Sequence, residues 1–365
     1  MKIQDHAFAA DLQNWISEHL SPYTPTSKAE KLVSIHSLVR ELAQSNLLTR
    51  GWPAPYGDND IRKQLYLHFS LARQALGAVG LCLASHIDIG ARGLLDKGSP
   101  ALIDKWLPKA LTGDAIFSLA MTEPDAGSDL QGIQFTANKS EEGWILNGVK
   151  RGITNLPFAD AALVLARTNA CRSPFSYSLF LVPIETAGIT REQAVPTLAY
   201  HGCLGGISAK DAVIPLDNLI GPFGAGLMLL MKHLETERLF VSARMLGIST
   251  YLIEELILHT RNSPQCALQA DNVARLKMQL MAFEAYFETC VNAFEEGELS
   301  AKDSAALKYM GSSLLKSASN TLADYSGAQG YLRGTPAIRF TTEAMGLALA
   351  GGSEEIMLSI IGNTL

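Results

Sequence analysis

The chain has 365 residues, of which 47% are hydrophobic and only 18% charged, so it has ample material for a buried core and is not expected to be disordered. Its formal charge of −6, without a run of lysine or arginine, excludes the basic surface of a nucleic-acid-binding protein. Every apolar run ends before the roughly 20 residues needed to cross a bilayer, so no membrane span is expected.

The length favours two or three modest domains. The first residues, MKIQDHAFAADLQNW, do not combine a basic segment with a following apolar run, so no export signal is expected. Five scattered cysteines form no CxxC pair, which favours reduced thiols over disulfides or a zinc site. We therefore expect a cytoplasmic protein without a bound metal.

Residues 1–113 are predicted to be helical. Apolar residues recur at three- and four-residue spacing in the stretch that includes Ile35, Leu38, Val39 and Leu42. The segment GWPAPYGDND, residues 51–60, is expected to be a loop, and a helical stretch rich in small residues follows it.

Residues 114–222 are predicted to form an antiparallel β domain. Short β-type segments, among them AIFSLAM, WILNGVK, ALVLART, SLFLVP and DAVIP, are bounded by Gly, Pro, Asn or Asp. Asn147-Gly148 inside the second segment is typical of a tight hairpin turn. Because no helix-length pattern separates these strands, a Rossmann-type unit is not expected.

Residues 223–365 are predicted to be helical again. Long helical patterns cover about 226–260, 270–296 and 301–325, and a shorter pair follows. The chain order is therefore helical, then β, then helical, and the fold class is α+β.

Two glycine-rich segments and one histidine carry weak signals. GPFGAG, residues 221–226, lacks a following Lys-Ser/Thr and a βαβ context, so we interpret it as a turn that enters a helix. GCLGG, residues 202–206, is interpreted as a flexible loop. His233 and Glu237 are spaced i, i+4 on one helix face, but no third ligand suggests a metal site.

The strong signal is the string MTEPDAGSD, residues 121–129, at the end of the first predicted strand. It supplies hydroxyl groups and a glycine turn through which backbone N–H groups can approach a planar or phosphorylated ligand. With WILNGVK and the ITN of residues 153–155, this string resembles the flavin-binding signature of the acyl-CoA dehydrogenase family. The resemblance extends over the whole chain and implies an N-terminal helical domain, a middle β-barrel-like domain, a C-terminal four-helix bundle and FAD as the cofactor.

The resemblance also implies roles for individual residues. Met121 and Thr122 match the donors to the flavin ring, Ser128 matches the serine near the FAD pyrophosphate, and Thr154 matches the threonine near flavin N5. The remaining FAD contacts would come from a neighbouring subunit of a homodimer or homotetramer, through Arg261 to a phosphate and through Gly327 and Gly330 at the adenine end.

The resemblance breaks where the family most often carries its catalytic base. The Tyr-Glu-Gly-Thr string is replaced by residues 350–353, Ala-Gly-Gly-Ser, so Gly351 offers only its backbone N–H, which would polarise the thioester carbonyl. Isovaleryl-CoA dehydrogenase-like members take the base from the residue before an arginine on the first C-domain helix. Here these residues are Glu237, expected to be the α-proton base after burial raises its pKa, and Arg238, expected to line the acyl pocket. The alternative for Glu237 is a solvated residue in a charged cluster with Glu235 and Arg238.

Other departures leave the substrate and the electron acceptor open. The family tryptophan on the flavin face is replaced by Gly152, which makes room for oxygen or a bulkier ligand. The expected activity is α,β-dehydrogenation of an acyl thioester on CoA or of an acyl or aminoacyl group on a carrier protein, with an electron-transfer flavoprotein as possible partner. A flavin oxidase on the same fold is one alternative, and a non-catalytic carrier-protein-binding or structural member is the other.

Overall fold

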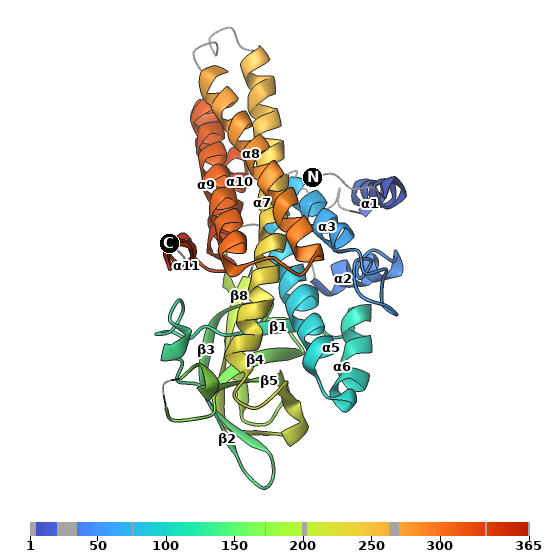
Figure 1. The fold of residues 1–365 in the computed structure, drawn as a ribbon, viewed down its shortest axis with the longest axis vertical. Coiled ribbons are helices and arrows are strands. Elements are labelled where there is room, and N and C mark those ends of the chain that lie inside the picture. The colour runs from blue at the N-terminus through green and yellow to red at the C-terminus, as the bar shows by residue number, and fades with distance from the viewer. Residues whose placement is uncertain are drawn as a thin grey trace.

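The computed structural model describes residues 5–19, 35–74, 76–171, 173–198, 203–262, 270–332 and 334–363. Figure 1 shows a sheet at one end of the long axis, a helical bundle at the other, and the N-terminal helices along one side of both. The long helix α7 (Gly226–Asn262) runs from the sheet through the middle of the molecule to the far end of the bundle. This arrangement confirms the predicted α+β fold.

The N-terminal part consists of helices that pack around a shared core. In chain order they are α1 (His6–His19), α2 (Ile35–Gln44), α3 (Ile61–Arg73), α4 (Gly77–Leu83), the π-helix η2 (Ala84–Ala91), α5 (Arg92–Lys97) and α6 (Pro100–Thr112). The predicted apolar face of α2 is buried. All eight residues of η2 are buried as well, so polar groups in this segment need partners inside the protein.

The middle part is one sheet of nine described strands: β1 (Phe117–Ala120), β2 (Thr136–Lys139), β3 (Trp144–Thr154), β4 (Ala161–Arg167), β5 (Tyr177–Pro183), β6 (Ile189–Arg191), β7 (Val195–Pro196), β8 (Cys203–Ile214) and β9 (Leu219–Ile220). The order is β6-β8-β3-β2-β4-β5-β9, with β1 beside β4 and β7 beside β8. Most pairings are antiparallel, as predicted, but β1 and β2 each run parallel to β4.

Two local predictions in the sheet are wrong. Asn147-Gly148 does not form a hairpin, because both residues lie inside the continuous strand β3, where the pairing with β8 shifts register between Leu146 and Gly148. Gly148 has φ +137°, so its conformational freedom serves a β-bulge. The GCLGG segment is not a loop beyond residue 202, because Cys203 begins β8.

The C-terminal part contains α7, α8 (Ala270–Glu295), α9 (Ala301–Tyr325), α10 (Pro336–Leu349) and α11 (Glu354–Gly362). The turn at residues 221–226 leads into α7, and Gly221 and Gly224 there adopt φ of +72° and +79°. By length and composition one stretch, Ala337–Gly362, is apolar enough to cross a membrane. In the structure this stretch contains two shorter helices, α10 and α11. Because its length and composition would still allow a span, the expectation that the chain has no membrane span stays a prediction.

Candidate functional site

The first half of the candidate site is the contact between the end of β1 and the end of β3. The Arg151 N–H donates to the Thr122 carbonyl at 3.1 Å, and the Thr122 hydroxyl donates back to the Arg151 carbonyl at 2.5 Å. These two bonds hold Met121 and Thr122 beside the end of β3, where Thr154 pairs with Leu204 of β8. Three of the predicted flavin contacts thus lie on adjoining segments of the sheet.

A buried ion pair between Lys150 and Glu123, which was not predicted from the sequence, stabilises this contact. Lys150 Nζ donates to the Met121 carbonyl and to Glu123 Oε1, both at 2.8 Å. The Glu123 carboxylate also accepts the backbone N–H groups of Gln134 and Phe135. Burial lowers the pKa of Lys150 to about 8, against the opposing effect of Glu123. The glutamate of the motif is therefore a structural anchor of the loop.

The residues at this contact fit the flavin that the resemblance implies. A Cβ built on Gly152 would meet only the Thr122 hydroxyl oxygen, at 3.7 Å, so the surface beside Thr122 is open where the family carries a tryptophan. Ser128 is exposed on the same loop and is accessible to a ligand. The hydroxyl and backbone groups at this edge suit a planar, hydrogen-bonding ring.

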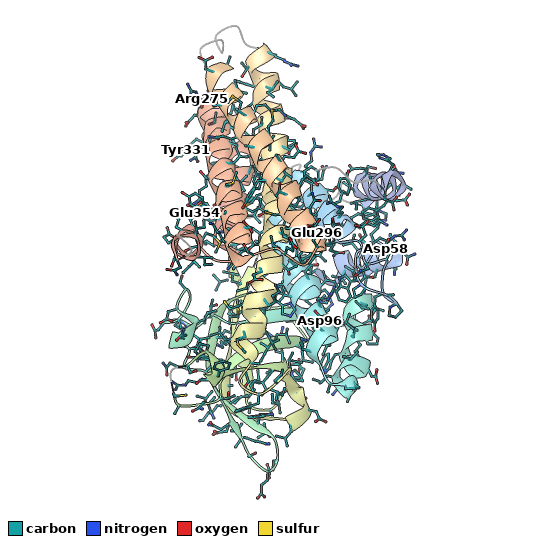
Figure 2. The ribbon with its side chains drawn as sticks, viewed as in Figure 1. Asp58, Asp96, Arg275, Glu296, Tyr331 and Glu354 are labelled. Atoms are coloured by element: carbon teal, nitrogen blue, oxygen red, sulfur yellow. The ribbon has the colours of Figure 1, made fainter. Side chains whose placement is uncertain are left out.

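Three predicted cofactor contacts lie away from this region. Arg261 is exposed in the last turn of α7, at the end of this helix that is far from the sheet. At 1.5 Å per residue it lies about 36 Å along the helix axis from Glu237, the predicted base on the same helix. Gly327 and Gly330 lie in the short helix η7 (Gly327–Tyr331), whose end, Tyr331, is labelled in Figure 2 on the bundle far from the sheet. Gly330 packs against the Ala323 carbonyl, where a Cβ would approach to 2.2 Å. Contacts of these residues with FAD across a subunit boundary stay a prediction.

The second half of the candidate site surrounds Glu237 on α7. Its side chain is buried, with the residue 4% exposed, so it is not the solvated surface residue of the alternative interpretation. Glu235 instead pairs with Lys232 near the surface. Glu237 Oε1 accepts a hydrogen bond from Arg244 at 2.6 Å, whereas Oε2 has no partner among the described residues.

Glu237 lines a pocket of about 100 Å³ that is partly open to solvent. Apolar walls come from Trp52, Ile61, Phe240 and Phe294. The polar residues that line the same pocket are Gln64, Asp88, Arg92, Asp96, His233 and Thr236. Asp96, labelled in Figure 2, pairs with Arg92 at 2.9 Å.

Burial dominates the electrostatics of Glu237. The pKa of the carboxyl is raised to about 7, chiefly by burial; the charge and hydrogen bond of Arg244 act to lower this pKa, and the nearby Asp88 acts to raise it. A carboxyl with this pKa is half ionised at neutral pH, which suits a general base. Arg244 and Asp88 were not identified from the sequence, although each is an isolated charge within an apolar helical stretch.

The backbone at Gly351 is held next to the same helix. Arg238 Nε donates to the Gly351 carbonyl at 3.2 Å, and Lys308 donates to the carbonyls of Ala348 and Gly352. Arg238 and Lys308 are both buried, and within the described part of the chain neither has a carboxylate within ion-pair distance. These cations fix the carbonyls of the loop, whereas the Gly351 N–H has no acceptor among the described residues. The sequence analysis expected Arg238 to line the acyl pocket. In the structure its guanidinium instead binds the loop that contains Gly351.

No group of three or more potential ligand residues that could hold a metal occurs among the described residues. Cys171 and Cys290 are free thiols. The described side chains at the site supply acid–base and hydrogen-bonding groups, and the sheet edge fits the flavin.

Comparison with known families gives matches along almost the whole chain. The N-terminal, middle and C-terminal domain models of acyl-CoA dehydrogenase match residues 4–114, 118–211 and 224–365. Among curated relatives, the mitochondrial isovaleryl-CoA dehydrogenase of Pongo abelii is 28% identical over 363 residues, covering 95% of this chain and 85% of that protein. The mitochondrial long-chain specific acyl-CoA dehydrogenase of Mus musculus is 28% identical over 290 residues, covering 77% of this chain and 67% of that protein.

Solved structures share the fold at lower identity. Butyryl-CoA dehydrogenase from Megasphaera elsdenii superposes with a TM-score of 0.90 at 23% identity, covering 100% of this chain and 99% of the other. The prolyl acyl carrier protein oxidase AnaB gives a TM-score of 0.90 at 22% identity with the same coverage. The FAD complex of PigA gives 0.91 at 22% identity, again over 100% and 99% of the two chains.

Proposed function

Because the chain belongs to the acyl-CoA dehydrogenase family, whose members are FAD-dependent oxidoreductases acting on CH–CH bonds, we propose that it introduces an α,β double bond into an acyl thioester with Glu237 as the base. The observation that carries this assignment is the Glu237 carboxyl itself. It is buried, its pKa is raised to about 7, and its Oε2 has no partner among the described residues while the side chain lines a pocket.

In the proposed reaction the α-proton of the thioester moves to Glu237 Oε2, and the electron pair of that C–H bond forms the new double bond. A bound FAD would supply the acceptor for the hydride that leaves the β-carbon. The Gly351 N–H donates to the thioester carbonyl oxygen and stabilises the negative charge that develops there. Met121, Thr122, Ser128 and Thr154 hold the cofactor in this proposal.

The proposal also concerns the group that carries the acyl thioester, which is either CoA or a carrier protein. The formal charge of −6 and the low content of lysine and arginine supply little attraction for the phosphates of CoA. One structural neighbour with this fold is a prolyl acyl carrier protein oxidase, which supports a carrier-bound substrate. We therefore favour an acyl or aminoacyl group on a carrier protein, tested by comparing kcat/KM for the same acyl group on CoA and on a carrier.

The test of the base is the variant Glu237→Gln, mixed with a saturated acyl thioester without oxygen. Bleaching of the flavin absorbance should slow by at least about a hundredfold, since a positioned general base contributes 10²–10⁴-fold. Glu235→Gln, which removes a carboxylate two residues earlier on the same helix, is the matched control and should bleach normally. Normal bleaching by the Glu237 variant would exclude this residue as the base.

A flavin oxidase is the second candidate, favoured by the open surface beside Gly152. Release of peroxide during turnover would identify it, whereas dependence on an electron-transfer flavoprotein would identify a dehydrogenase. A non-catalytic member would purify colourless and would fail to take up FAD.

A further inference from the structure

We propose that Arg244 is a positioning residue for Glu237, and that Arg244, His68 and Asp88 form a buried relay that sets the orientation and the charge of the base. This inference rests on the proposed function of Glu237. The relay joins three elements, because His68 lies on α3, Asp88 on η2, and Glu237 and Arg244 on α7.

The hydrogen bonds of the relay have only one possible direction. A guanidinium has donors and no acceptor, so Arg244 donates through Nη2 to Glu237 Oε1 at 2.6 Å and through Nη1 to His68 Nδ1 at 3.1 Å. His68 Nδ1 must then be the acceptor, and Nε2 carries the proton that is donated to Asp88 Oδ2 at 2.7 Å. His68 is therefore a neutral imidazole, in line with its pKa, which burial and the charge of Arg244 lower.

The surroundings are shaped to hold Arg244 in this place. Its side chain is fully buried, and Gly80 of α4 leaves the space for it, since a Cβ there would approach Arg244 Cδ to 2.7 Å. The far end of the relay is fixed as well, because Gln64 Nε2 donates to Asp88 Oδ1 at 3.2 Å. Residues of three elements thus form one chain of hydrogen bonds, from Gln64 through Asp88, His68 and Arg244 to the Glu237 carboxylate.

This geometry selects one oxygen of the base. Oε1 is held by the guanidinium, and Oε2 is left without a partner among the described residues. A carboxylate fixed at one oxygen cannot rotate freely about its terminal bond, so Oε2 keeps one direction at little entropic cost during reaction.

The relay also places opposing charges around the base. Arg244 favours the ionised carboxylate, whereas Asp88 and burial favour the protonated form. The other titratable or charged groups around the pocket are His233 on α7, Arg92 on α5 and Asp96, which pairs with Arg92. Burial lowers the pKa of His233, which favours the neutral form of this side chain. Arg244 and Asp88 are then the charges whose removal should shift the base, in opposite directions.

The experiment compares Arg244→Met and Asp88→Asn in the pH dependence of anaerobic flavin bleaching. The rate rises with pH as Glu237 ionises. Arg244→Met should move this rise upward by at least one pH unit, which is about a fivefold loss of rate at pH 7, and Asp88→Asn should move it downward. Arg244→Lys keeps the charge but cannot bridge both partners, so its shift should be smaller than that of Arg244→Met. Ser249→Ala, a buried change elsewhere on α7, is the control that should leave the profile in place.

A second measurement does not depend on turnover. For each variant, the pH dependence of the urea unfolding midpoint is measured with and without Glu237→Gln, and the difference between the two curves reports the pKa of Glu237 in the folded protein. The same opposite shifts are expected. Should Arg244→Met fail to fold, Arg244→Lys and Asp88→Asn provide the same contrast.

Shifts in the same direction, or equal losses of rate at all pH values without a shift, would overturn the relay and leave a purely structural ion pair. The proposed function fails separately, if Glu237→Gln still bleaches the flavin at the normal rate.

Discussion

The sharpest consequence of the buried base concerns stability rather than turnover. Glu237 has a folded-state pKa of about 7 against an ordinary value of 4.5, with burial as the largest cause. Between these two pH values the folded protein holds a proton that the unfolded chain has released. The free energy of unfolding of the native protein should therefore fall as pH rises through this range, and the variant Glu237→Gln should lack this component.

The size of the effect follows from the shift. A difference of roughly 2.5 pKa units, at 1.36 kcal/mol per unit, corresponds to about 3 kcal/mol. The stabilisation from the protonated carboxyl is complete below pH 4.5 and is lost as pH passes 7. At pH 8 the native protein then holds a buried carboxylate whose main compensation is Arg244.

The assay is urea unfolding of the FAD-bound protein and of Glu237→Gln at several pH values between 4.5 and 8, followed by intrinsic fluorescence. Because the chain contains several packed parts, the informative quantity is the difference between the two proteins at each pH. The difference should change by about 3 kcal/mol across the range. Glu235→Gln controls for the loss of one surface-proximal carboxylate. Curves for the native protein and the Glu237 variant that stay parallel would refute the buried, proton-holding base.

Three further predictions test the rest of the site. Lys308→Met should leave the carbonyls of Ala348 and Gly352 without their donor. Because the Gly351 N–H is then less well placed in the transition state, kcat should fall about tenfold with little change in KM. Unchanged steady-state kinetics would contradict this role. Lys150→Met should leave the buried Glu123 carboxylate without its cation and with only the backbone N–H groups of Gln134 and Phe135 as donors, at a cost of about 3 kcal/mol in unfolding free energy, and the purified protein should contain less flavin by absorbance. Gly152→Trp should slow reoxidation of the flavin by oxygen in stopped-flow absorbance; the φ of +70° at this residue costs about 1–2 kcal/mol in stability for any residue with a Cβ.

The order and type of the elements were predictable because each has a strong local signal. The apolar spacing of α2 and the β-type segments of β4 and β5 correspond to buried faces in the structure. Asn147-Gly148 failed as a hairpin signal because the same dipeptide also suits a bulge, and only the long pairing of β3 with β8 decides between the two. The parallel partners of β4 were not predictable, since strand order depends on long-range packing.

The candidate site was predictable only where a single residue matches a position of known role in the family's sequence pattern. Glu237 was identified from its position before Arg238, but its partners were not, because His68, Asp88 and Arg244 come from three separate helical segments. Their signal is a charge or an imidazole within an otherwise apolar stretch, such as Arg244 in LFVSARMLGIS. Such a residue must find a partner when buried, yet the sequence does not say which one.

The adjacency of Glu237 and Arg238 explains how one helix can organise both halves of the reaction. Consecutive residues on an α-helix point about 100° apart. Accordingly Glu237 turns toward η2 and the N-terminal helices, where Arg244 donates to it and the charge of Asp88 lies nearby, while Arg238 turns toward the loop that contains Gly351. A thioester placed between these two directions would present its α-carbon to Oε2 and its carbonyl oxygen to the Gly351 N–H. Gly351 lies in the turn between α10 and α11, and the bond from Arg238 to its carbonyl ties this turn to α7, so Gly351 needs no side chain to take part.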